Sequence, residues 1–138
     1  MCARGRYDES IKEYLAAVKN PLYATPALAY INAGVCSARK KDLAGAENFY
    51  GKALQIEPLN HQAAYQLATL QYQRKDAATA YKTLQNALVT RPGPEILLLT
   101  VQVTNNLNMQ EAERDARMQL LQQFPESEQA KKLRTEKF

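Results

Sequence analysis

The chain of 138 residues contains one histidine, two cysteines, five glycines and no tryptophan. The single histidine, His61, cannot form a histidine cluster for a metal, and Cys2 and Cys36 lack the C-x-x-C spacing of zinc and redox sites. The five glycines are isolated from one another, so the chain has no glycine-rich phosphate loop. We therefore expect neither a metal nor a cofactor.

The acidic residues offer no distinct acid–base pair. They fall on helix faces that we expect to be solvated, and examples are Glu47, Glu57, Glu111 and Glu113. Cys2 has no histidine close in the sequence to activate it as a nucleophile. Because no set of residues supports catalysis, we expect no enzymatic activity.

With five glycines and six prolines, the chain has little material for the many turns of an all-β fold. Helix-forming residues dominate instead, chiefly Ala, Leu, Gln, Lys and Glu. A hydrophobic content of 46% and a charged content of 23% are typical of a globular domain. The sequence therefore predicts an all-α protein.

Long apolar segments are absent as well. The most apolar run, ILLLTVQV at residues 96–103, is far shorter than the roughly 20 residues of a membrane-spanning helix. The opening stretch, MCARGRYDES, lacks the apolar core of a signal peptide. We therefore expect a soluble chain, whose compartment its own first residues do not define.

The formal net charge is +4. Basic residues gather in SARKKD, YQRKD and AKKLRTEKF, and the first two groups end predicted helices, where cations suit the negative end of the helix dipole. Nucleic-acid binding would need the basic residues on one face together with aromatic partners. We expect no nucleic-acid partner and no small-molecule substrate.

Two segments, residues 42–58 and 76–92, repeat the same pattern at a spacing of 34 residues. The matched positions are Asp42 and Asp76, Ala46 and Ala80, Tyr50 and Leu84, Ala53 and Ala87, and Pro58 and Pro92. Upstream of them, Gly34 matches Ala68 at the same offset. Large and small apolar residues that alternate in this way predict helices that cross closely, with aspartate N-caps and prolines that end the second helix.

This period and pattern resemble the tetratricopeptide repeat, in which a helix A and a helix B form one unit and successive units stack. The resemblance implies an all-α solenoid of stacked helix-turn-helix units with a C-terminal capping helix. It is closest over residues 27–60 and 61–94. The following unit has lost about two residues of the template, and Asn108 with Glu111 predicts a capping box that opens its helix B.

We expect one domain over residues 1–138, and its parts follow from the repeats. They are a partial repeat at 1–24 that is mainly a helix B, repeats at 25–60 and 61–92, a divergent repeat at 93–125, and a capping helix at 126–138. The segment MCAR would be the end of a helix A whose body is absent. We therefore expect the full protein to have further residues upstream.

Cys2 has two interpretations that the sequence leaves open. It can be a small, half-buried residue at a helix end, or it can form a disulfide with Cys36, since both fall late in adjacent A helices. Spacing alone does not decide between them, because a disulfide depends on geometry.

In a tetratricopeptide stack the A helices line a concave groove, and the resemblance implies which residues face it. These residues are Ile31, Asn32, Val35, Arg39, Tyr65, Thr69, Tyr72, Gln73, Leu97, Val101 and Asn105. Tyr65, Thr69 and Tyr72 form one stripe of a helix. Tyrosine is a good contact residue because it offers apolar area and a polar tip. The alternative is that the tyrosines pack between neighbouring A helices.

The predicted groove is apolar and aromatic with one cation, so we expect a protein partner that presents an extended or helical segment with apolar side chains. Chaperone-type repeat domains hold a peptide carboxylate with Lys, Arg and Asn at fixed groove positions. Those positions here carry Ile31, Val35, Gln66, Pro94 and Leu98. The sequence therefore argues against an adaptor for chaperone tails.

A narrower resemblance rests on three stretches: GRYDES near the start, NPLYATPALAYINAGVCSARKKDLAGAENFYGKAL at residues 20–54, and LLQQFPESEQAKKL at residues 120–133. Together they resemble the C-terminal part of the tetratricopeptide lipoproteins of type IV pilus biogenesis, the PilF/PilW pilotin family. The resemblance implies a protein at the periplasmic face of the outer membrane that assists secretin assembly. Its lipid-bearing cysteine would lie upstream, so Cys2 is not that residue.

Two alternatives stay open at this stage. The chain could be a generic tetratricopeptide adaptor in another multiprotein complex, or a regulatory repeat segment of a larger enzyme. A signal sequence with a lipid-attachment cysteine upstream would favour the pilus interpretation, and a catalytic domain on the same chain would favour the enzyme.

Overall fold

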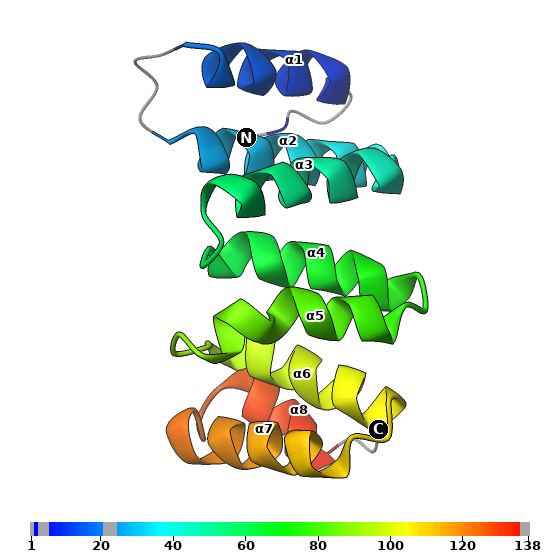
Figure 1. The fold of residues 1–138 in the computed structure, drawn as a ribbon, viewed down its shortest axis with the longest axis vertical. Helices are drawn as coiled ribbons and strands as arrows, with labels where there is room; N and C mark the ends of the chain where they lie inside the picture. The colour runs from blue at the N-terminus through cyan, green and yellow to red at the C-terminus, as the bar shows by residue number, and fades with distance from the viewer. Residues whose placement is uncertain (1, 3–5, 21–24, 136–138) are drawn as a thin grey trace. The chain divides into compact units, whose positions relative to one another are not determined.

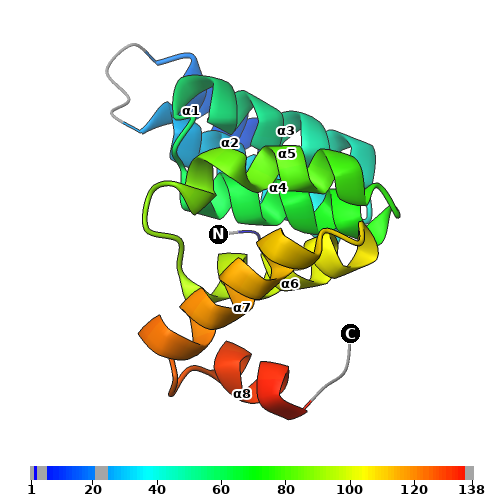
Figure 2. The ribbon, with the colours of Figure 1, turned by 60° about the horizontal axis from the view of Figure 1, so that its bottom comes forward.

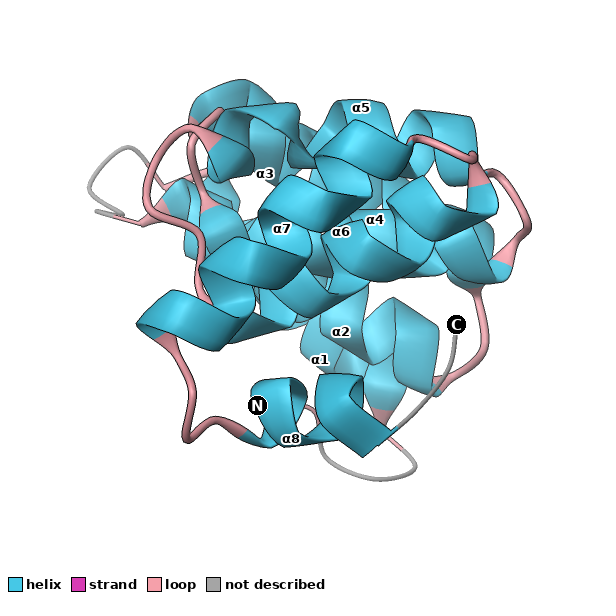
Figure 3. Ribbon diagram, turned by 90° about the horizontal axis from the view of Figure 1, so that it is seen from below, coloured by secondary structure: helices cyan, strands magenta, loops and turns pink. Residues whose placement is uncertain are grey.

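The computed structural model describes residues 2, 6–20 and 25–135, and the regular structure among them is helical, with no strand (Figure 3). The eight helices of this part are α1 (Tyr7–Val18), α2 (Pro26–Arg39), α3 (Leu43–Ile56), α4 (His61–Gln73), α5 (Ala77–Leu88), α6 (Pro94–Asn106), α7 (Gln110–Gln123) and α8 (Glu128–Thr135) (Figure 1). The prediction of an all-α fold is confirmed. No described helix is long and apolar enough to cross a membrane.

The helices fall within the ranges expected from the sequence. The range 1–24 contains α1, 25–60 contains α2 and α3, 61–92 contains α4 and α5, 93–125 contains α6 and α7, and 126–138 contains α8. The division of the chain into repeats at those boundaries stays our proposal. The expected end of a helix A over residues 1–4 lies outside the described residues, apart from Cys2.

The chain divides into two compact units, residues 1–70 and 71–138, and the boundary falls within α4. In the first unit α2 packs against both α1 and α3, as Figure 1 shows. Its core joins residues of α2, α3 and α4: Ala27, Ile31, Ala46, Tyr50, Ala53, Ala63 and Leu67. Small alanines dominate this set, and they allow the helix backbones to approach closely around the few large side chains.

Gly34 of α2 and Tyr50 of α3 approach each other closely in this unit. Tyr50 is 1% exposed, and a Cβ atom added at Gly34 would lie 2.5 Å from its Cε1 atom. Burial also raises the pKa of Tyr50 to about 12, because the phenolate would lose its hydration. The prediction that Gly34 is a close-contact position is therefore confirmed, and Tyr50 is the residue it accommodates.

The second unit is built around α6, which contacts α5, α7 and α8 (Figures 1 and 2). Eight of its residues are buried: Ile96, Leu97, Leu98, Leu99, Thr100, Val101, Val103 and Thr104. The two threonines satisfy their buried hydroxyl groups by donating to helix carbonyls one turn earlier, those of Ile96 and Thr100. The capping helix α8 adds Ala130 and Leu133 to the same core. The predicted C-terminal cap is thus a packed element of the fold.

Aspartate caps begin two of the B helices. Asp42 accepts a hydrogen bond from the Gly45 amide at 3.0 Å, and Asp76 accepts one from the Thr79 amide at 3.2 Å. Hydrogen bonds from Thr79 lower the pKa of Asp76 below its ordinary value of 3.8, since they favour the ionised carboxylate. The sequence prediction of these two N-caps is confirmed.

Each turn from an A helix to a B helix has the same backbone bonds. Asp42 N–H donates to the Ser37 carbonyl, Asp76 N–H to that of Gln71, and Met109 N–H to that of Thr104. The residue before each donor has a positive φ: Lys41 at 68°, Lys75 at 66° and Asn108 at 58°. These features define a Schellman motif, in which glycine is the usual left-handed residue.

The third of these turns corrects a sequence prediction. Asn108 does not cap α7 in a capping box with Glu111. It is the left-handed turn residue, and the N-cap is Met109, which makes no side-chain cap bond. Asparagine adopts positive φ more readily than most residues, and the turn uses that property.

Replacing the lysine at either of the other two turns with glycine should stabilise the chain. A side chain in the left-handed region is strained by its Cβ atom, and glycine relieves that strain. We expect Lys75→Gly to raise the free energy of unfolding by about 0.5–1 kcal/mol. This net gain allows for two opposing effects, the greater entropy of the unfolded chain with glycine and the removal of a favourable cation at the helix end. Thermal and urea unfolding of the variant measures this gain.

Asn108→Gly is the matched control at the equivalent turn. Because asparagine already tolerates positive φ, we expect a smaller gain than for Lys75→Gly. A loss of stability in Lys75→Gly, or an equal gain in both variants, would contradict the assignment of strain to the lysine.

Candidate partner-binding surface

The structure separates the predicted groove residues by exposure. Asn32, Val35, Tyr65, Thr69, Tyr72 and Asn105 are half-buried, and Arg39 and Gln73 are exposed. These eight can offer surface to a partner. Ile31, Leu97 and Val101 are at most 1% exposed.

The three buried residues require a correction, because their side chains lie in the two hydrophobic cores. Ile31 belongs to the cluster with Tyr50 and Leu67. Leu97 and Val101 belong to the core around α6, and α5, α7 and α8 all pack on that helix. Because three neighbouring helices cover α6, Leu97 and Val101 are buried and do not line the groove predicted along the A helices.

In the first unit the accessible residues of the predicted surface come from α2 and α4. Val35 packs on the hydrophobic cluster that contains Leu67, and it keeps part of its side chain accessible. Tyr65 is half-buried, and its carbonyl accepts a hydrogen bond from the Thr69 hydroxyl at 2.7 Å. This bond leaves the threonine methyl group and the tyrosine ring as the apolar components of the stripe.

In the second unit Tyr72 has a definite packing role. Its hydroxyl donates to the Gln102 carbonyl on α6 at 3.5 Å, and its ring is half-buried. Tyr72 thus packs between two helices at A positions, in agreement with the alternative that the sequence left open for the tyrosines. Its exposed part is still available to a partner, as are Gln73 and Asn105.

Cationic residues surround the end of α2. Arg39, Lys40 and Lys41 are all exposed, and Lys40 pairs with the Asp8 carboxylate on α1. The hydrogen bond from this pair raises the pKa of Lys40 above its ordinary value of 10.5. Of these three cations, Arg39 is the one that lies at a predicted groove position.

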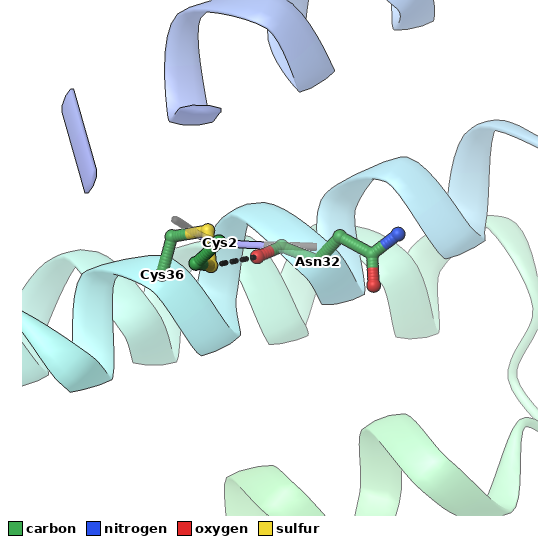
Figure 4. Close-up of a disulfide and its surroundings, with 3 residues drawn as sticks. All are labelled: Cys2, Asn32 and Cys36. Carbon is green, nitrogen blue, oxygen red and sulfur yellow. Dashed lines mark hydrogen bonds between the residues drawn. A yellow bond between two sulfur atoms is a disulfide. The ribbon is translucent and has the colours of Figure 1, made fainter. Parts of the chain in front are cut away.

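Cys2 and Cys36 form a disulfide, with Cα atoms 5.5 Å apart (Figure 4). The Cys2 Sγ lies 3.9 Å from the carbonyl oxygen of Asn32, whose side chain points away from the disulfide. Since a disulfide sulfur carries no proton, this is a contact and not a hydrogen bond. The disulfide fixes the chain at Cys2 against α2, the helix that carries Asn32, Val35 and Arg39.

A hollow in the second unit was not predicted from the sequence. It has a volume of about 230 Å³, and residues of α5, α6 and α7 line it, among them Tyr81, Leu88, Leu97, Ala112 and Asp115. The available signal was the pair of small residues Ala112 and Ala116, one turn apart on α7.

The described residues contain no group of three or more histidine, cysteine, aspartate or glutamate side chains placed to hold a metal ion. The carboxylates singled out in the sequence are half-buried at Glu47 and Glu113 and exposed at Glu57 and Glu111. Glu113 pairs with Arg117 at 3.4 Å, and Glu57 accepts a hydrogen bond from Asn60.

Residues 38–102 match the tetratricopeptide repeat family. No curated protein sequence matches the chain.

Two solved structures share the fold along nearly the whole chain. PilW, described as a widely conserved type IV pilus biogenesis factor, matches with a TM-score of 0.77 and 27% identity over 97% of this chain and 62% of its own. PilF of Pseudomonas aeruginosa matches with a TM-score of 0.77 and 21% identity over 97% of this chain and 61% of its own, which shows a shared fold.

The chain spans about three fifths of the length of each of these two proteins. It is therefore an all-α protein whose residues 38–102 match the tetratricopeptide repeat and which is similar in fold to PilW and PilF along nearly all of its own length.

Proposed function

We propose that this chain is a non-catalytic protein-interaction scaffold of type IV pilus biogenesis. The similarity to PilW over 97% of the chain is the observation that carries the proposal. The chain matches 62% of PilW, so we extend the proposal to a longer protein. In that protein a lipid-modified cysteine upstream holds the repeats at the periplasmic face of the outer membrane, where they assist assembly of the pilus secretin.

The disulfide supports the proposed compartment. Disulfides form and persist in oxidising environments, including the bacterial periplasm, and are rare in the reducing cytosol. The Cys2–Cys36 bond closes a separation of 34 residues and is nearly buried, which is typical of a structural disulfide. A chain with such a bond is suited to the periplasm.

The proposed contact residues are the eight accessible ones. On the first unit they are Asn32, Val35, Arg39, Tyr65 and Thr69, and on the second they are Tyr72, Gln73 and Asn105. Each unit offers an aromatic side chain together with amides, and the first unit adds an arginine and branched side chains, which fits a peptide segment with apolar side chains and exposed backbone polar groups. The partner is therefore a protein, with no role for nucleic acid or a small-molecule substrate.

A pull-down with purified periplasmic domains of the secretin tests the proposal. We expect this chain and the full-length gene product both to retain the secretin domains. Retention by the full-length product alone would keep the pilus role and place the contact upstream of this chain. Retention by neither would overturn the secretin proposal and favour an adaptor in another complex or a regulatory segment of a larger protein.

The tyrosine stripe supplies a sharper test of the surface. We expect Tyr65→Ala/Tyr72→Ala to weaken secretin binding by about 2 kcal/mol, because aromatic contact residues carry much of the energy of an interface. The loss of unfolding free energy should be smaller, since both rings are only half-buried. Isothermal titration calorimetry and thermal unfolding measure the two effects.

Tyr65→Phe/Tyr72→Phe is the matched control, because it keeps both rings and removes only the hydroxyl groups. We expect it to bind nearly as well as the parent chain. If the alanine variant lost far more stability than affinity, the tyrosines would be packing residues and the proposed surface would be wrong.

A further inference from the structure

The second unit has a groove between two B helices, on surfaces that the predicted partner site does not use. Tyr81 and Leu88 of α5 form one wall, Ala112 and Asp115 of α7 form the other, and the buried Leu97 of α6 lies beneath them. We call this the α5–α7 groove. Because alanine stands opposite tyrosine and leucine, the walls leave about 230 Å³ of space.

The groove continues into a second hollow at the start of α7. That hollow has a volume of about 450 Å³, and Met109, Glu111, Ala112 and Asp115 are among the residues that line it. Ala112 and Asp115 are common to both hollows. The surface therefore runs from an apolar slot to an acidic entrance.

The two carboxylates at this entrance have no cationic partner within the described part of the chain. Glu111 and Asp115 are one helical turn apart, both are exposed, and neither is in an ion pair. By contrast, Glu113 on the same helix pairs with Arg117. The entrance thus has an uncompensated negative charge, although the chain as a whole has a net charge of +4.

We propose that the α5–α7 groove binds a basic amphipathic segment of a partner protein. An apolar side chain of the segment fills the slot against Leu88 and Ala112. A lysine or arginine one turn away pairs with Glu111 and Asp115, and its aliphatic stem lies along the ring of Tyr81. This proposal concerns a different surface from the proposed secretin contact and does not depend on it.

The size and the charge of the groove select this occupant. The slot holds about 230 Å³, a volume that suits one large side chain. The free carboxylates at its entrance favour a cationic neighbour over a neutral or acidic one. A helix or extended strand with lysine or arginine next to leucine or methionine meets both conditions.

The test uses the full 138-residue chain and an amidated peptide of twelve residues that carries lysine and leucine at helical spacing. We expect titration followed by amide NMR to shift the signals of Tyr81, Ala112 and Asp115 first. The charge-reversal variant Glu111→Lys/Asp115→Lys should weaken binding about tenfold, since attraction becomes repulsion at two positions.

Two further variants separate the groove from general charge attraction. Glu126→Lys reverses an exposed carboxylate between α7 and α8, outside the groove, and we expect a change within about twofold. Ala112→Leu fills the slot without altering charge, and we expect it to weaken binding about tenfold at an unchanged melting temperature.

Four outcomes of the peptide titrations would overturn the proposal. They are shifts that map outside the groove, equal binding of a control peptide with glutamate in place of lysine, an equal loss in Glu126→Lys, and full binding by Ala112→Leu. Concentration-dependent shifts of the same amides without peptide would also overturn it, because the occupant would then be a second copy of this chain.

Discussion

Reduction of the Cys2–Cys36 disulfide is expected to lower the free energy of unfolding by about 4 kcal/mol. The bond joins residues 34 positions apart, and for a loop of that length the chain-entropy relation gives a loss of about 4 kcal/mol. Small domains are typically stable by about 5–15 kcal/mol. Reduction should therefore remove a large share of the total and lower the melting temperature clearly.

The loss should be concentrated at the N-terminal end of the first unit. Ser10 is the one residue of α1 that is buried, whereas seven residues of α2 are buried. α1 packs on α2, and the exposed Asp8–Lys40 ion pair links it to the residue that follows α2. Exposed ion pairs add little to the free energy of unfolding. We expect reduction to accelerate amide hydrogen exchange in α1 far more than in α3.

Thermal unfolding with and without a phosphine reductant checks the first effect, and hydrogen exchange checks the second. The control is Cys2→Ala/Cys36→Ala, whose melting temperature should be as low as that of the reduced parent and should not respond to reductant. Quantitative alkylation of both thiols in the unreduced chain would show that no disulfide forms and would contradict both expectations.

Regular features of the fold were predictable because they depend on local chemistry. Asp42 and Asp76 stand before apolar repeats, and the structure shows both carboxylates accepting amide hydrogen bonds at the helix starts. The pairing of Gly34 with a large neighbour also followed from the 34-residue offset. Period and cap chemistry define these positions without knowledge of the tertiary packing.

Asn108 shows where local chemistry was ambiguous. Asparagine followed three residues later by glutamate fits a capping box, but asparagine is also favoured at positive φ. Asn108 lies 33 residues after Lys75 and takes the same turn position, with φ of 58° and 66°. The chain is thus one residue shorter between these two turns than the 34-residue period requires. The sequence does not show where that residue is missing, because this unit matches the repeat pattern only loosely.

The exposed face of an A helix could not be predicted residue by residue. Ile31, Leu97 and Val101 are buried. Whether such an A-helix residue lies in the core or faces the groove depends on how many helices pack around it. α8 packs on α6 and helps to enclose it. The disulfide could not be predicted either, because it requires a short distance between the two Cα atoms that the sequence spacing does not reveal.

Gly34→Leu is expected to lower the free energy of unfolding by roughly 1–3 kcal/mol, because the core has no room for the added side chain. The Cβ atom alone would approach three atoms of the Tyr50 ring at 2.5, 2.7 and 2.9 Å. Tyr50 is 1% exposed and cannot move into solvent without opening the contact between α2 and α3. Urea unfolding of the variant measures the loss, and an unchanged transition midpoint would contradict the assigned contact.

Gly51 provides a matched control on the neighbouring helix. It lies in α3 directly after Tyr50, and a Cβ atom added there meets nothing within 4 Å. Glycine in a helix interior is less favourable than alanine by about 0.8–1.0 kcal/mol. We expect Gly51→Ala to stabilise the chain by up to that amount, so a loss in both variants would point to a general intolerance of substitution.

The chain itself indicates how the Gly34 defect can be repaired. At the positions 34 residues later, the chain has Ala68 in place of Gly34 and Leu84 in place of Tyr50. The small residue of the pair is thus larger there, and the large residue is smaller. We expect Gly34→Ala to be destabilising beside Tyr50 and much less so in the Tyr50→Leu background. The double-mutant cycle should therefore give a favourable coupling of about 1 kcal/mol or more. Strict additivity would mean that the two residues do not share this contact, and the match between the repeats would then have no packing basis.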